Sequence, residues 1–145
     1  MNPAYVSAVF AWEGELPSSF VIITAYHQHG RISPDSRNKH QDATLKSVLS
    51  ARGLNPVRVV GMSPDASHQE PSWAVRLEEP AALELGRVFK QEAIFIVREG
   101  ALSVVKCSQK QKAGEVRELS MGAWPSEPNA PITLEASLAQ LGAGR

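Results

Sequence analysis

The fold is decided by one stretch of sequence, Phe20-Val21-Ile22-Ile23-Thr24-Ala25-Tyr26. It is rich in β-branched and aromatic residues, and its apolar residues occupy consecutive positions. This pattern predicts a strand of a sheet that is covered on both faces. The turn residues Pro17-Ser18-Ser19 precede it. Upstream, the apolar residues fit either a helix face or the two faces of a strand. We therefore expect residues 1–19 to be an N-terminal segment that packs on a domain beginning at Phe20.

Helix and strand patterns alternate downstream of this stretch. Ser33-Pro34 is typical of a helix N-cap followed by proline, with Ser36 as a rival cap, and Gly53 is typical of a helix end. Gly86 inside the second helix permits close approach to the sheet. The predicted elements are a helix from 33 to 52, strands at 57–60 and 73–77, a second helix beginning at Pro80, and a β-hairpin formed by 93–97 and 102–105.

This order, β-α-β-β-α-β with one extra hairpin strand, predicts an α+β fold. We expect the split β-α-β (ferredoxin-like) type, an antiparallel sheet of four or five strands with two helices on one face. The core domain would span residues 20–107. Residues 108–145 contain scattered prolines and glycines, which predict an extended C-terminal tail, and 134–141 allows a short helix.

The composition excludes several classes of protein. The chain has 145 residues, which suits one domain, and 15 Lys and Arg residues balance 15 Asp and Glu. Cys107 is the single cysteine, so an intramolecular disulfide and a cysteine-rich zinc site are excluded. No Lys or Arg precedes Arg31, and no apolar run approaches the roughly 20 residues that span a bilayer. We expect a soluble cytoplasmic protein without a membrane partner, and the oligomeric state stays open.

Basic residues gather around the predicted first helix. Six basic and two acidic residues lie between Arg31 and Arg58. Gly30, Arg31 and Arg37 flank the helix start, where unpaired N–H groups and the helix dipole favour an anion. A phosphate or carboxylate site is one interpretation, and a turn glycine beside solvated arginines is the other. The loop lacks the glycine-lysine pattern of nucleotide triphosphatases.

A second group of polar residues enters the third predicted strand. His68, Glu70 and Ser72 share one face of an extended chain, and Pro71 predicts a strand start or an edge. Because a histidine beside a carboxylate can exchange protons, His68 and Glu70 are candidate catalytic residues. The alternative is a loop histidine with a satisfied hydrogen bond. A metal site built from the chain's histidines matches no zinc spacing, so we predict no metal and no cofactor; these histidines are His27, His29, His40 and His68.

Several motifs together resemble a bacterial family, the domain of unknown function family 3293, over residues 20–105. They are Phe20–Tyr26 with Gly30 and Asn38, Gly61-Met-Ser-Pro64, His68-x-Glu70-x-Ser72, and Gly86-Arg-x-Phe-x-Gln91-x-Ala93-Ile-Phe. The family pattern has Asn-Pro where this chain has His27-Gln28. The resemblance implies a bacterial, cytoplasmic protein and supplies no activity. It also implies a set of candidate site residues: Tyr26, Asn38, His68, Glu70, Ser72 and Gln91.

Our leading hypothesis is a domain that binds a small anionic ligand, phosphorylated or nucleotide-like. Arg31, Arg37 and the helix start would hold the anion, with Tyr26, Asn38, Ser72 and Gln91 as further ligand-binding residues. His68 and Glu70 would orient the ligand or move a proton. This requires the two stretches to meet in one hollow. The alternative is a protein or nucleic-acid interaction module that uses the basic first helix and Lys106–Arg117, without catalysis. Whether the protein is an enzyme stays open.

Overall fold

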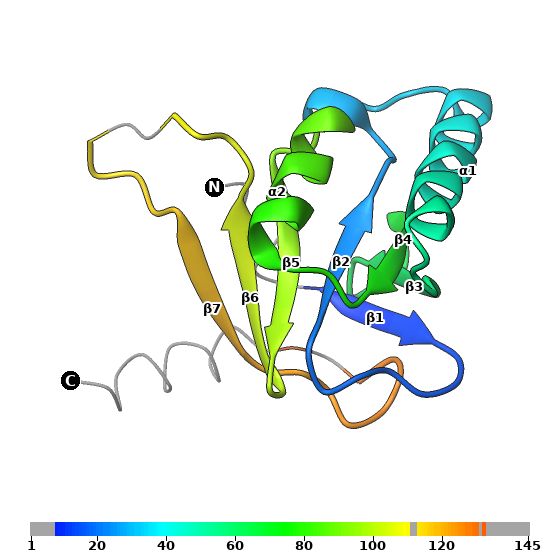
Figure 1. Cartoon of the computed structure of the whole chain (residues 1–145). Helices are drawn as coiled ribbons and strands as arrows, with labels where there is room; N and C mark the ends of the chain where they lie inside the picture. Colours follow the sequence, from blue (N-terminus) through cyan, green and yellow to red (C-terminus); the bar gives the residue numbers. More distant parts are fainter. Residues whose placement is uncertain (1–7, 111–112, 131, 133–145) are drawn as a thin grey trace.

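Seven strands form one antiparallel sheet in the order β1-β3-β4-β2-β5-β6-β7 (Figure 1). The computed structural model describes residues 8–110, 113–130 and 132. The strands are β1 (Val9–Trp12), β2 (Phe20–Thr24), β3 (Val57–Met62), β4 (Gln69–Val75), β5 (Ala93–Arg98), β6 (Ala101–Lys106) and β7 (Glu118–Ala123). The helices are α1 (Asp35–Ala51), α2 (Glu79–Val88) and the 3-10 turn η2 (Gln28–Gly30).

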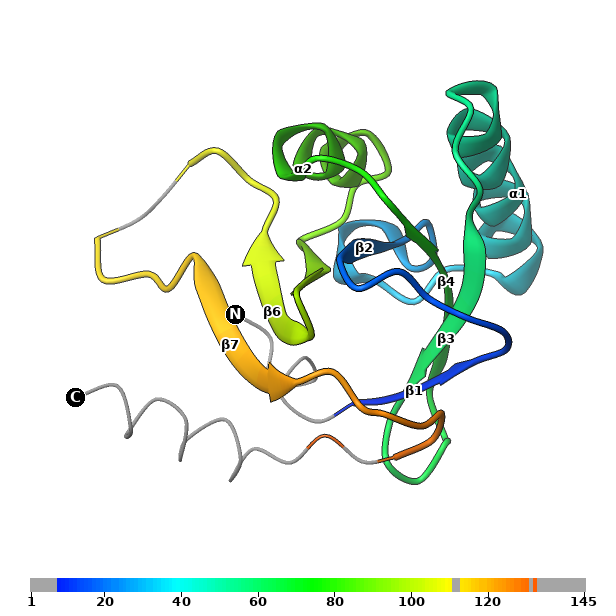
Figure 2. The same cartoon turned by 60° about the horizontal axis from the view of Figure 1, so that its bottom comes forward.

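The ferredoxin-like prediction is wrong. The sheet has seven strands instead of four or five, and it curls into a half-barrel (Figure 2). β1 comes from the N-terminal segment whose periodicity was ambiguous, and β7 comes from the segment predicted to be an extended tail. A short flat sheet with helices on one face would leave its other face in water. Here that face is apolar, and curling buries it in a core of its own.

Two hydrophobic cores lie on opposite sides of the sheet. The side chains of β2 alternate between them: Val21 and Ile23 belong to the core under α1 and α2, while Phe20 and Ile22 belong to the core inside the curl. All four side chains are at most 3% exposed. The consecutive apolar residues that begin at Phe20 are therefore explained by a central strand with two buried faces.

Trp124, immediately after β7, ties the two ends of the curled sheet together. Its ring centroid lies 5.0 Å from that of Phe10 and 5.1 Å from that of Trp12, both on β1, and 5.2 Å from that of Phe20. Farther along, the Asn129 backbone N–H donates to the Phe10 carbonyl at 2.8 Å. This aromatic cluster closes one end of the half-barrel.

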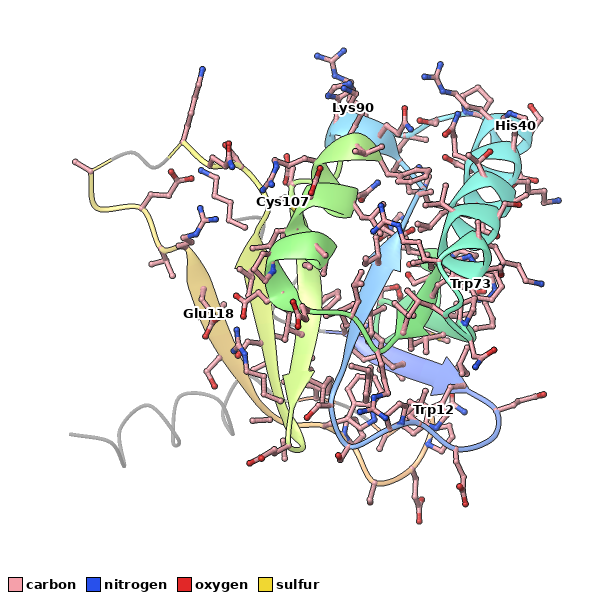
Figure 3. The ribbon with its side chains drawn as sticks, in the orientation of Figure 1. Trp12, His40, Trp73, Lys90, Cys107 and Glu118 are labelled. Atoms are coloured by element: carbon pink, nitrogen blue, oxygen red, sulfur yellow. The ribbon has the colours of Figure 1, made fainter. Side chains whose placement is uncertain are left out.

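An ion pair and an indole ring attach α1 to the sheet. Arg58 of β3 donates two hydrogen bonds to the Asp42 carboxylate, at 2.9 and 2.5 Å. The same guanidinium lies 3.7 Å from the ring centroid of Trp73 on β4. Trp73 is labelled in Figure 3, next to α1. The planar guanidinium can make both contacts at once, which fixes the position of the helix.

Pro71 lies inside β4, which begins at Gln69, four residues earlier than the sequence predicted. Its only paired neighbour is Val60 of β3, because the pairing of β2 with β4 ends at Thr24 and Ser72. At Pro71, β4 is therefore unpaired on the side that faces β2, and the missing N–H of proline is tolerated there. α1 also differs: Pro34 takes the N-cap position, and the Ser33 hydroxyl donates to the Arg31 carbonyl instead.

Two further expectations from the sequence are a short helix near the C-terminus and the absence of a membrane-spanning helix. The short helix expected at 134–141 lies outside the described residues. In the part of the chain that the structure describes, no helix is both long and apolar enough to cross a membrane.

Gly86 brings α2 into close contact with the sheet, as the sequence predicted. A Cβ atom at this position would lie 2.5 Å from Cys107 Sγ and 3.1 Å from Ile94 Cγ2. Cys107, labelled in Figure 3, is fully buried against α2. The helix cannot move outward without opening the core that it covers.

We expect Gly86→Ala to lower the free energy of unfolding by about 1–3 kcal/mol, although alanine is the better helix former. Urea denaturation measures this change. The variant Gly86→Ala/Cys107→Ala should lose less than the sum of the two single variants, because removing Sγ makes room for the new methyl group. Strict additivity would contradict the contact.

Candidate functional site

The sheet splits at one end because β2 is shorter than its neighbours. The pairing of β2 with β5 ends at Ile22 and Phe95, while β5 continues to Ala93. The pairing of β2 with β4 ends at Thr24 and Ser72, while β4 continues to Gln69. Between the start of β4 and the start of β5, no β2 residue fills the space.

Thr24 satisfies the backbone groups at the end of β2. Its hydroxyl donates to the Pro71 carbonyl at 2.9 Å and accepts from the Tyr26 N–H at 3.0 Å. The β4 carbonyl at the split is therefore bonded to a side chain instead of to a strand backbone. This arrangement lets the chain leave the sheet without unpaired polar groups.

The chain leaves β2 through a strained turn. His27 and His29 have φ values of 48° and 61°, in the left-handed region that non-glycine residues rarely adopt, and Gly30 follows at 68°. A Cβ atom on Gly30 would also lie 2.9 Å from the Glu92 carboxylate. Glycine adopts this backbone angle without the strain that a side chain adds, and it lets the Glu92 carboxylate approach closely.

Side-chain amides hold the turn in place. Asn38 of α1 is 3% exposed; its Oδ1 accepts from the His27 N–H at 3.0 Å, and its Nδ2 donates to the Ser33 carbonyl at 3.1 Å. From the other side, Gln91 Nε2 donates to the Tyr26 carbonyl at 3.0 Å. The His29 N–H donates to the carbonyl of Lys90, which Figure 3 labels at this end of the molecule.

A cavity of about 500 Å³ occupies the split. Its walls come from β1, β3, β4, β5, the turn after β2, the β3–β4 turn and the connection between α2 and β5. The residues that line it include Phe10, His27, Gly61, His68, Glu70, Gln91, Glu92 and Phe95. The site therefore combines segments from most of the chain, including β1, which the sequence analysis did not resolve.

One row of the sheet gives the cavity its depth. Phe10 of β1 is opposite Gly61 of β3, and Gly61 is opposite Glu70 of β4. Gly61 has no side chain, and the Phe10 ring packs over it: a Cβ atom there would lie 3.4 Å from Phe10 Cε1. Glu70 is the first inward-facing residue of β4 beyond the end of β2.

The Glu70 carboxylate has no hydrogen-bond or ion-pair partner among the residues that the structure describes. The side chain is half-buried, and burial raises its pKa to about 7. Burial disfavours the charged form of a carboxyl when no cation compensates. Near neutral pH, Glu70 is therefore present both with and without its proton.

His27 presents a hydrogen-bond donor at the cavity. Its Nδ1 accepts from the Ser33 N–H at 3.3 Å and lies 3.5 Å from Asn38 Nδ2, also a donor. With Nδ1 serving as an acceptor, a neutral ring carries its proton on Nε2. His68 and Glu92 are exposed residues at the mouth of the cavity.

The β3–β4 turn, which borders the cavity, is ordered by Asp65. The hydroxyls of Ser63 and Ser67 each donate to Asp65 Oδ1 at 2.7 Å, and the Ser67 N–H donates at 3.1 Å. These hydrogen bonds lower the pKa of Asp65 to about 2. The turn that carries His68 is thus held in one conformation by an ionised carboxylate.

The structure brings together three of the residues that the sequence singled out: His68, Glu70 and Gln91 line the cavity. No hydrogen bond joins His68 to Glu70 in the described residues. Three others, Tyr26, Asn38 and Ser72, are buried beside the cavity and make local hydrogen bonds. The Ser72 hydroxyl donates to the Glu70 carbonyl at 3.0 Å. The ligand-binding and catalytic roles of all six stay predictions.

Arg31 and Arg37 do not line the cavity. Both are exposed, and Arg37 donates to the Gln28 side chain at 3.3 Å. The basic segment near β6 is also engaged within the chain: Lys106 pairs with Glu115, and Arg117 donates to the Ser108 carbonyl at 2.6 Å. Part of the basic surface that the interaction-module hypothesis requires is therefore engaged in contacts within the chain.

Among the cavity residues that sequence reasoning did not assign to a ligand site are Phe10, His27 and Glu92. Phe10 belonged to a segment whose periodicity was ambiguous, and His27 was considered only as a metal ligand. Glu92 carried a usable signal, since it directly follows Gln91 at the entry to a buried strand. In the described ranges, no group of three or more His, Cys, Asp or Glu side chains could hold a metal ion.

The comparison with known proteins matches the segment that forms this split. The family model described as "Protein of unknown function (DUF3293)" matches residues 23–94. The chain belongs to this family. The matched DUF3293 segment runs from the end of β2 to the start of β5 and contains Glu70, Gln91 and Glu92, while Phe10 and Phe95 lie outside it. No curated protein and no solved structure matches the chain.

The raised pKa of Glu70 makes stability depend on pH. Between its ordinary value of 4.5 and about 7, the folded protein holds a proton that the unfolded chain releases, so stability falls as pH rises through this window. We expect Glu70→Gln to raise the free energy of unfolding by about 3 kcal/mol at pH 8 and by about 1 kcal/mol at pH 5.

Urea denaturation at the two pH values measures this difference. Glu84→Gln serves as the control, because it removes one carboxylate from an exposed position on α2 outside the cavity. An equal gain from Glu70→Gln at pH 5 and pH 8 would show that Glu70 is ionised throughout, as a solvated carboxylate is.

Proposed function

We propose that this protein binds a small organic molecule in the cavity of the split sheet, with the Glu70 carboxyl contacting the polar group of the ligand. The volume of about 500 Å³ lies within the usual range for small-molecule sites, roughly 300–1,000 Å³. The walls combine aromatic rings with a few convergent polar groups, which is the usual composition of such sites.

The observation that carries this proposal is the Glu70 carboxyl, which has no partner among the residues that the structure describes. A half-buried carboxyl without a partner costs folding free energy, and proteins seldom retain such groups without a use. The surrounding structure does not relieve this cost: Gly61, opposite Glu70 on β3, offers it no side chain, and Ser72 bonds to its backbone instead of its side chain. A ligand would supply the missing partner.

Proton exchange with the ligand is the chemistry that Glu70 allows. A carboxyl with a pKa of about 7 can both donate and accept a proton near neutral pH. His68 at the mouth of the same cavity is a second titratable group within reach of a bound molecule. The catalytic role predicted for His68 and Glu70 is thus part of this proposal, with the two residues acting on the ligand separately.

An anionic ligand at the start of α1 is the competing hypothesis. It depends on Arg31 and Arg37, which are exposed and lie outside the cavity lining. Asn38 is occupied by the turn after β2. The geometry therefore favours the cavity over the helix start as the place where a ligand binds.

Ligand-observed NMR with five probes tests the proposal: benzylamine, phenylacetate, benzyl alcohol, inorganic phosphate and AMP. We expect the wild-type protein to bind at least one of the three phenyl-containing probes (benzylamine, phenylacetate and benzyl alcohol) and Gly61→Val to bind none of these three. Valine suits a strand, the backbone of Gly61 is not left-handed, and the added methyl groups would lie beside the Phe10 ring at a residue that lines the cavity, which reduces the cavity.

Glu84→Gln and Arg37→Ala are the controls and should bind as the wild type does. Binding of phosphate or AMP that survives in Gly61→Val and is lost in Arg37→Ala would overturn the proposal in favour of the helix-start site. Absence of binding of all five probes to the wild type would overturn both.

A further inference from the structure

The charges that line the cavity have one predominant sign. Four titratable residues line the cavity: Glu70 from β4, Glu92 from the α2–β5 connection, His68 from the β3–β4 turn and His27 from the turn after β2. Among the described residues that line it, there is no lysine or arginine. With neutral histidines and ionised carboxyls, the cavity is negative, and an anion would find no fixed positive charge inside it.

Aromatic rings complete the walls. Phe10 and Phe95 come from opposite sides of the split, and their ring centroids lie 5.1 Å apart with the planes at 85°. The faces of aromatic rings attract cations, most strongly where water is excluded. Phe10 is 1% exposed and presents almost no ring surface to the cavity, so Phe95, which is partly exposed, forms more of the wall.

The space beside Glu70 suits a donor with several hydrogens. The carboxylate has no partner among the described residues, and Gly61, opposite it on β3, adds no side chain to the cavity. An ammonium group can donate hydrogen bonds to the carboxylate while the carbon to which it is attached contacts the apolar wall of the cavity. A neutral alcohol could donate only one hydrogen bond and would leave the charge uncompensated.

This inference rests on the proposed function: we infer that the ligand is an organic amine bound as its ammonium ion, with the positive group against the Glu70 carboxylate. This assigns a ligand class to the cavity. It also gives Glu92, at the mouth beside Gly30, the role of attracting the cation to the entrance.

Binding of an ammonium ion must be linked to the proton on Glu70. The cation binds the ionised carboxyl, so below pH 7 binding requires the release of a proton, whereas above pH 7 it does not. Affinity should rise with pH and then level off. From pH 5.5 to pH 8 the expected gain is about 30-fold, the ratio of the ionised fractions at the two pH values. An anionic ligand would show the opposite sign, with proton uptake.

Calorimetric titration with benzylamine, which is an ammonium ion at both pH values, tests the inference. Titrations in two buffers of different ionisation heat give the number of protons released. We expect proton release at pH 5.5, about 30-fold tighter binding at pH 8, and loss of this pH dependence in Glu70→Gln. His68→Gln should retain it, because His68 is exposed at the mouth.

The outcomes separate this inference from the proposed function. Tighter binding of phenylacetate or benzyl alcohol than of benzylamine, lost in Gly61→Val, would overturn the ligand class and leave the cavity as the binding site. A pH dependence that persists in Glu70→Gln would assign the linkage to the histidines and overturn the position given to the ammonium group. No binding of any probe overturns both proposals.

Discussion

The length of β2 is the constraint on which the rest of the structure depends. β2 lies in the middle of the sheet, and its side chains supply both hydrophobic cores, so it cannot be removed or shifted without disturbing each. It nevertheless ends at Thr24, while β4 and β5 continue past it. A gap in the centre of a sheet exposes backbone groups and apolar surface, which is costly unless other groups cover them. The polar side chains at this end of the molecule meet that requirement.

The turn after β2 shows how this arrangement is stabilised. Two histidines in left-handed conformations cost of order 1–3 kcal/mol each, so the turn would not hold its shape alone. Asn38 and Gln91 fix it from opposite sides, one from α1 and the other from the α2–β5 connection. Their amides can donate and accept at the same time, which a carboxylate or an ammonium group cannot do. The polar residues of this region thus divide into those that build the cavity and those that line it.

The sequence predicted the local elements well and their assembly poorly. Both helices, the β5–β6 hairpin and the central strand follow from periodicity and turn residues within a few positions. The curl does not, because it depends on contacts such as Trp124 with Phe10, which join segments more than a hundred residues apart. The burial of Glu70 follows from the same assembly, since Phe10 and Gly61 complete its row. The exposure of Arg37 could not be predicted either, because the sequence pattern only places this residue near a helix start.

The alternating polar residues of β4 illustrate why spacing alone could not assign their roles. His68, Glu70 and Ser72 share a face, yet each meets a different environment because β2 ends beside them. Ser72 is paired with Thr24 and is buried, so its hydroxyl bonds locally. Glu70 lies one inward-facing position farther along, beyond the last β2 residue, and its carboxyl faces the cavity with no partner in the described part of the chain. His68 precedes the strand and reaches solvent. A β2 longer by two residues would place a neighbour beside Glu70 and remove the cavity, so the position of one strand end determines whether this chain has a site at all.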